Sequence, residues 1–116
     1  MPSDAVIGPL TDIRENINLA LSFVADVSLD QFLADRRTVY AVTRCLEIIS
    51  EASRRLPDEL KARHPHIRWR GMAGAGNVYR HDYERVLDRA VWDTVQESLR
   101  PLLAVVEEEL RQLGGG

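Results

Sequence analysis

Apolar positions recur along most of this chain at intervals of three and four residues, the spacing of a helix that buries one face. One such stripe consists of Leu10, Ile13, Ile17, Leu21 and Val24. A second consists of Val39, Val42, Leu46, Ile49, Ser53 and Leu56, and a third of Val91, Val95, Leu99, Leu102, Val106 and Leu110. No segment alternates apolar and polar residues for long enough to predict a strand. The pattern therefore predicts an all-α helical bundle.

Local signals divide these helices. Ser28 followed three residues later by Gln31 predicts a capping box that opens a short helix. Pro57 predicts the end of the long helix that carries the second stripe. One or two further helical turns are expected over residues 58–63, and the last helix is expected from about residue 88 to 113.

Composition is typical of a soluble globular protein, with 45% apolar and 28% charged residues in a chain of 116. This length fits one domain, predicted over residues 1–113 and followed by a disordered tail at 114–116. No apolar run is long enough to span a membrane, and the start of the chain lacks the pattern of a signal peptide. The single cysteine, Cys45, is predicted to be a buried thiol, and a cytoplasmic location is expected.

Charge is unevenly distributed. The net charge is −3, but the segment from Lys61 to Arg89 holds seven Lys or Arg against three acids, so it is +4 and the remainder is −7. The same segment contains all three histidines. This separation favours a local anion-binding site. A solvated helix face explains a charge cluster equally well.

Candidate chemistry is concentrated in residues 76–83. On a helix, Asn77 and His81 share a face, and Arg80 lies near Asn77. His81 can take and give a proton near neutral pH, and a guanidinium can bind phosphate bidentately. A base and a fixed cation suffice for internal RNA cleavage without a metal or another cofactor, because the base deprotonates the ribose 2′-OH. The alternative is that His81 caps a helix or makes a hydrogen bond in the core, and that Tyr83 is a packing residue.

A zinc site is the other enzymatic possibility. His64, His66 and His81 are available, with Asp82 nearby. The spacing of known zinc motifs is absent, so no metal site is predicted. Trp69 and Trp92 are expected to anchor the core rather than to stack on bases.

The order and spacing of several motifs resemble those of the HepT-like proteins of the HEPN superfamily, which are the toxin halves of HEPN–MNT toxin–antitoxin modules. The resemblance covers nearly the whole chain and includes an opening helix at residues 10–13. Its further motifs are Phe32-Leu33, Leu46-Glu47-Ile48-Ile49-Ser50-Glu51-Ala52, Ile67-Arg68-Trp69-Arg70-Gly71-Met72, Asn77-x-x-x-His81-x-Tyr83 and Val91-Trp92. It implies a HEPN-like up-down bundle of four to five helices, a homodimer and a metal-independent endoribonuclease site in the cleft between subunits.

The resemblance also assigns roles. His81 would be the general base or acid and Asn77 a positioning donor. The family's signature arginine falls on Gly76 in this chain, so Arg80 is expected to supply the phosphate clamp, and the alternative is that Arg70 reaches into the site. Tyr83 matches the tyrosine that the partner nucleotidyltransferase adenylylates to silence the toxin.

Arg70 and Arg85 are expected to bind the RNA substrate. Two other interpretations stay open. The chain could be a degenerate HEPN module that binds RNA or an MNT-type nucleotidyltransferase without cleavage, or a structural dimer with no role in nucleic-acid binding.

Overall fold

A computed structural model describes the backbone of residues 2–72 and 85–114, and the side chains of residues 5–72 and 87–114. The described elements are α1 (Pro2–Phe23), α2 (Leu29–Ala34), α3 (Arg36–Arg54), α4 (Asp58–Ala62) and α6 (Arg85–Gly114). All of these elements are helices, which confirms the predicted all-α bundle. Helix α6 continues to Gly114, one residue beyond the expected domain boundary.

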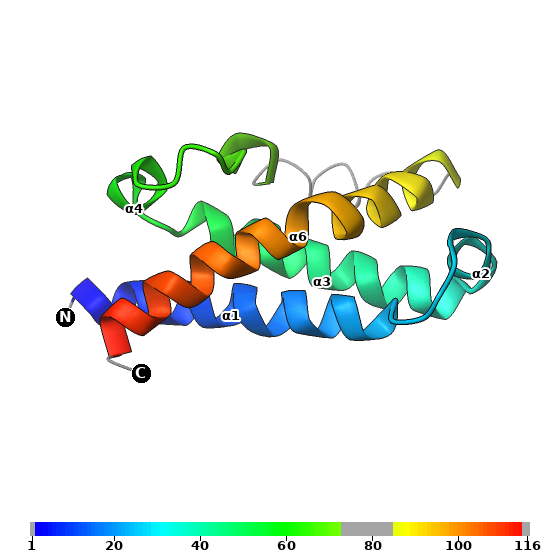
Figure 1. The fold of residues 1–116 in the computed structure, drawn as a ribbon, viewed down its shortest axis with the longest axis horizontal. Helices are drawn as coiled ribbons and strands as arrows, with labels where there is room; N and C mark the ends of the chain where they lie inside the picture. Colours follow the sequence, from blue (N-terminus) through cyan, green and yellow to red (C-terminus); the bar gives the residue numbers. More distant parts are fainter. Residues whose placement is uncertain (1, 73–84, 115–116) are drawn as a thin grey trace.

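Three long helices form the body of the molecule (Figure 1). Helices α1 and α3 lie side by side and run in opposite directions, and α6 crosses over both. The short helix α2 closes one end between α3 and α6. At the other end, α4 and the residues after it turn back along the bundle, near both chain termini.

The buried core follows the three apolar stripes. Residues on α1, α3 and α6 that are fully buried include Leu10, Ile13, Ile17, Val42, Ile49, Val95, Leu99 and Leu102. Leu21 and Leu110 are only partly buried, and Ala20 takes the expected place of Leu21 in the core. A period of 3.6 residues places Ala20 and Leu21 on opposite flanks of the face formed by Leu10, Ile13, Ile17 and Val24, so the packing of α1 against its neighbours decides which of the two is buried.

Helix boundaries follow the predicted signals. The Ser28 hydroxyl accepts from the Gln31 amide at 3.1 Å, and the Gln31 side chain accepts from the Ser28 amide at 2.9 Å, so the capping box is confirmed. Asp35 caps α3. Its carboxylate accepts a hydrogen bond from the Thr38 hydroxyl, and this bond lowers the pKa of the Asp35 carboxyl. Helix α3 ends at Arg54, and Pro57 directly precedes α4, as predicted.

Cys45 is buried within this core, and desolvation raises the pKa of its thiol, so the prediction of a core thiol is confirmed. Within the described residues, no helix combines the length and apolar character needed to cross a membrane.

The amino-terminal end of α6 is fixed to α2 and α3. Asp88 on α6 is buried and forms an ion pair with Arg36, which opens α3. This carboxylate raises the pKa of the Arg36 guanidinium. The rings of Phe32 and Trp92 pack with centroids 5.2 Å apart, so Trp92 is a packing residue as expected.

Candidate functional site

Four residues of the predicted catalytic and regulatory set lie outside the described residues: Asn77, Arg80, His81 and Tyr83. Asp82, considered as a metal ligand, lies there too, and so does Gly76, which occupies the position of the family's arginine. Their assignment stays a prediction from sequence.

The structure does describe the residues that lead into this set. We call residues 63–72 the basic segment, because it carries Arg63, His64, His66, Arg68 and Arg70. Of the two expected substrate-binding arginines, Arg70 lies in this segment and is exposed. Arg85 begins α6, and its side chain is outside the described part.

Glu109 on α6 holds the first end of the basic segment. Its carboxylate is almost fully buried, with 6% of the side chain exposed. It accepts from Arg63 Nη2 at 2.8 Å and Nε at 3.3 Å, and His64 Nε2 lies 2.6 Å from Oε2. An ionised carboxylate can only accept, so Nε2 of His64 carries the hydrogen in this contact.

These partners set the protonation state of Glu109. The Arg63 hydrogen bonds lower the pKa of the Glu109 carboxyl most, and the His64 bond adds to this effect against the opposing cost of burial. In return, Glu109 raises the pKa of the Arg63 guanidinium. Glu109 is therefore an ionised anchor that fixes the start of the basic segment to the carboxyl-terminal half of α6.

Trp69 fixes the middle of the segment. Its indole N–H donates to the carbonyl oxygens of Lys61 and His64, each at 3.1 Å. Its ring is partly buried against the core, which agrees with the prediction that Trp69 is an anchor. The Met72 amide then donates to the Arg68 carbonyl at 3.0 Å, and the Met72 side chain is buried. The segment thus has a defined path along α6.

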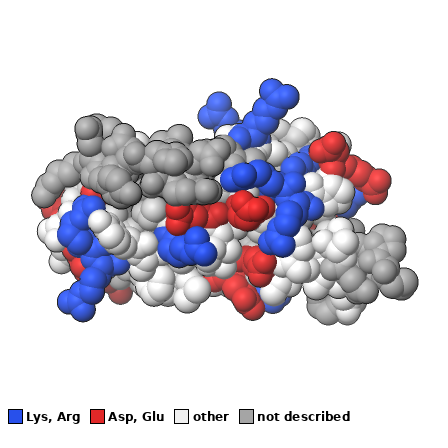
Figure 2. All heavy atoms as spheres, turned by 180° about the vertical axis from the view of Figure 1, so that it is seen from behind, with Lys and Arg blue, Asp and Glu red and all other residues white. Residues whose placement is uncertain are grey.

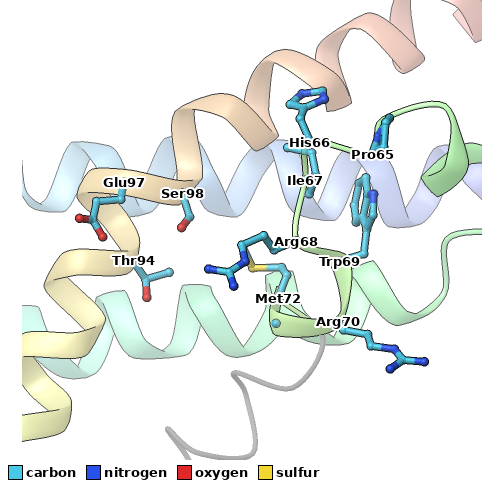
Figure 3. Close-up of a pocket in the computed structure, with 11 residues that line it drawn as sticks. Pro65, His66, Ile67, Arg68, Trp69, Arg70, Met72, Thr94, Glu97 and Ser98 are labelled. Carbon is cyan, nitrogen blue, oxygen red and sulfur yellow. The ribbon is translucent and has the colours of Figure 1, made fainter.

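A hollow of about 720 Å³ lies between the basic segment and α6 (Figure 3). We call it the segment hollow. It is lined by Pro65, His66, Ile67, Arg68, Trp69, Arg70, Gly71 and Met72 on one side, and by Thr94, Glu97 and Ser98 of α6 on the other. Its polar lining consists mostly of cations and hydroxyl groups, which suits an anionic ligand better than a cationic one.

The arginines of the hollow point in different directions. Figure 3 shows the Arg68 guanidinium directed across the hollow toward Thr94 and Ser98, whereas Arg70 points away from them. The carboxylate of Glu97 points away from Arg68. Neither arginine forms an ion pair with any residue that the structure describes.

The charge separation expected from sequence is reduced in three dimensions. Arg63 is paired with Glu109 and Glu59, and Arg89 lies 3.2 Å from Asp93. Figure 2 shows Lys and Arg intermingled with Asp and Glu across the back of the molecule, with further basic side chains projecting at its upper edge. The cations that stay available in the described part of the segment are therefore Arg68 and Arg70, together with Lys61 beside it.

Metal ligation has little support in the described ranges. The His64 and His66 rings lie with centroids 6.1 Å apart, but His64 is bonded to Glu109. In residues 2–72 and 85–114 no group of three or more His, Cys, Asp or Glu side chains is arranged to hold a metal ion.

Sequence reasoning missed Glu109 and Arg68. Glu109 follows Leu102 by seven residues and Val106 by three, so it is an acidic residue on the buried face of α6. An acid at an apolar position of the helical pattern is the signal that could have identified it. Arg68 offered no comparable signal, because its direction depends on how the segment packs against α6.

The fold and this anchored segment define a class: a small helical bundle that presents cations in a hollow beside its last helix. The model of the family "Ribonuclease HepT-like" matches residues 13–109. The chain therefore belongs to the ribonuclease HepT-like family, which confirms the resemblance found in the sequence.

Relatives agree with this assignment. The chain is 42% identical over 103 residues to "Probable ribonuclease HepT" of Thermococcus cleftensis, covering 89% of this chain and 93% of that protein. It is 33% identical over 115 residues to a protein of Methanocaldococcus jannaschii named "Putative RNase", covering 99% of this chain and 95% of the relative. A relative in Caldanaerobacter subterraneus, also described as a putative RNase, is 30% identical over 103 residues, which cover 89% of this chain and 92% of that protein. No solved structure matches the chain significantly.

Proposed function

We propose that this protein is a metal-independent endoribonuclease. The observation that carries the proposal is membership of the ribonuclease HepT-like family over residues 13–109, together with 42% identity to a relative named as a probable ribonuclease. The available cations on the basic segment support an RNA substrate, because phosphate contacts dominate affinity for nucleic acids.

The reaction follows from the predicted residues. His81 takes the proton from a ribose 2′-OH, and the resulting oxyanion attacks the adjacent phosphorus. The bond from phosphorus to the 5′ oxygen of the next nucleotide breaks, and that oxygen receives a proton from the protonated imidazole or from water. Arg80 stabilises the negative charge on the phosphorane, and Asn77 positions the phosphate. Arg70 and Arg85 bind flanking phosphates of the substrate.

The wider system is part of this proposal. The protein acts as a homodimer with RNA in the cleft between its subunits, as the toxin of a HEPN–MNT type toxin–antitoxin pair. An MNT-type nucleotidyltransferase silences it by adenylylating Tyr83. This modification adds a bulky, negatively charged group two residues after His81. This arrangement requires the Tyr83 phenol to be reachable by a second protein.

Gly76 favours a second candidate function. It stands where the family's signature carries arginine, so the cation beside the base is missing from its usual position. A chain without that cation would retain the fold and bind RNA or a nucleotidyltransferase without cutting. The two candidates differ in whether Arg80 replaces the missing group.

Cleavage of total tRNA separates these candidates. The purified protein, with Tyr83 shown to be unmodified by intact mass, is incubated with tRNA in excess chelator beside His81→Ala, Arg80→Ala and a control on α1, Arg14→Ala. We expect wild type and the control to cut, and the two site variants to lose about 100-fold or more in rate. If no protein cuts while wild type binds the RNA, the binding-module alternative is correct.

A further inference from the structure

We propose that the segment hollow is a binding site for a phosphodiester group of single-stranded RNA, and that Arg68 is the cation that holds it. This inference rests on the proposed ribonuclease function and adds to it a substrate contact outside residues 76–83. It assigns Arg68 a role in binding the substrate rather than in the chemical step.

The size and lining of the hollow fit such a ligand. Its volume of about 720 Å³ lies within the range of about 300–1,000 Å³ that is usual for small-molecule sites. A nucleotide can therefore enter with its phosphate against the polar groups. The Ser98 hydroxyl and the His66 imidazole line the same space and can donate further hydrogen bonds.

Arg68 is available for an outside anion, unlike most arginines of the described ranges. Arg55 lies 3.1 Å from Asp12, and Arg63 lies 2.8 Å from Glu109. Arg68 has no such partner among the described carboxylates, and Glu97 on the opposite wall points away from it (Figure 3). A guanidinium in this situation binds phosphate through two parallel hydrogen bonds.

The backbone that carries Arg68 is already fixed before any ligand binds. Trp69, the next residue, is held by two indole hydrogen bonds of 3.1 Å. The Arg68 carbonyl accepts from the Met72 amide at 3.0 Å. Because the main chain at Trp69 and Met72 is held on this side of the hollow, binding does not have to order the backbone that carries Arg68.

Binding of a non-cleavable RNA tests the inference. The probe is a fluorescent single-stranded 2′-O-methyl oligoribonucleotide of about 12 nucleotides, because methylation removes the 2′-OH that the proposed reaction requires. Its affinity is measured by anisotropy across a range of salt concentrations for wild type and Arg68→Gln. The matched control is Arg14→Gln, which removes the same charge from α1, where Arg14 lines a different hollow with Glu107 and Arg111.

We expect Arg68→Gln to weaken binding about tenfold and to reduce the slope of log K against log salt by about 0.7, the value for one lost phosphate contact on a single strand. Arg14→Gln should weaken binding less than about twofold, and Arg68→Lys should recover part of the loss because it restores the charge without the bidentate geometry. The inference is wrong if Arg68→Gln binds as tightly as wild type, or loses no more than Arg14→Gln. Circular dichroism of each variant establishes that it is folded.

Parallel cleavage of an all-ribose RNA separates this inference from the proposed function. If wild type cuts and Arg68→Gln binds and cuts equally well, the site in the hollow is rejected and the ribonuclease stands. If binding depends on Arg68 while no RNA is cut, the site is supported and the ribonuclease is rejected.

Discussion

The two ends of the basic segment both carry basic side chains but differ in the carboxylates that surround them. At the first end, Arg63 and His64 share a buried carboxylate, Glu109, whose pKa they hold low. At the second end, Arg68 and Arg70 have no carboxylate partner in the described ranges. One acid on the facing helix therefore decides which cations stabilise the fold and which stay available to a ligand.

The largest effect on stability is expected from removing the anchor. Glu109→Ala leaves Arg63 and His64 without their shared acceptor and opens a small cavity, so the free energy of unfolding should fall by about 3 kcal/mol. Chemical denaturation measures this change. Glu108→Ala is the matched control, because Glu108 pairs with Arg111 at the surface and its loss should cost about 0.5 kcal/mol or less. Equal losses in both variants would contradict the anchor.

The second effect concerns the middle of the segment. Trp69→Phe keeps most of the ring and removes the indole N–H that donates to two carbonyl groups, so we expect a loss of about 1–2 kcal/mol in the free energy of unfolding. Trp92→Phe is the control, because Trp92 contributes ring packing against Phe32. A larger loss in Trp92→Phe than in Trp69→Phe would argue against the indole bonds as a fixing element.

A smaller, pH-dependent effect follows from the lowered pKa of Glu109. Its folded-state pKa lies below the ordinary value of 4.5, so its stabilisation is complete above that value and is lost as the pH falls toward the folded-state pKa. Wild type should therefore lose stability more steeply below about pH 4.5 than Glu109→Gln does. Thermal melts between pH 3 and 7 measure both slopes. Identical slopes would show that Glu109 carries no such linkage.

The smallest effect sharpens the difference between the two exposed arginines. Arg70 points away from Thr94 and Ser98, so Arg70→Gln should weaken binding of 2′-O-methyl RNA only about two- to threefold, less than Arg68→Gln. Neither substitution should change the denaturation midpoint, because neither arginine has a described ion pair to lose. A greater loss of binding in Arg70→Gln would place the main phosphate contact on the outer side of the segment.

Much of the fold could be predicted from the sequence because it depends on local spacing. The three apolar stripes, the Ser28–Gln31 capping box and the break at Pro57 each follow from interactions within a few residues along the chain. Leu21 shows the limit of this reasoning, since a one-residue choice on the helix face is decided by the packing of α1 against its neighbours.

The described part of the site was harder to predict because it depends on contacts between distant residues. Arg63 and Glu109 form an ion pair although they are separated by 46 positions in the sequence. A count of charges along the sequence treats the two residues as independent. The +4 charge of the segment from Lys61 to Arg89 therefore overstated the cations available for binding. Residues 77–83 carry the predicted chemistry, and only experiments on His81, Arg80 and Tyr83 test it.

The most direct test of the central claim, that the second end of the basic segment binds RNA, is an NMR titration of the labelled protein with the 2′-O-methyl oligonucleotide. The account predicts shifts at the Trp69 indole N–H and at the amides of residues 66–72 and 94–98. Shifts confined to residues 44–54 of α3 or 107–114 of α6, with the Trp69 signal unmoved, would contradict it.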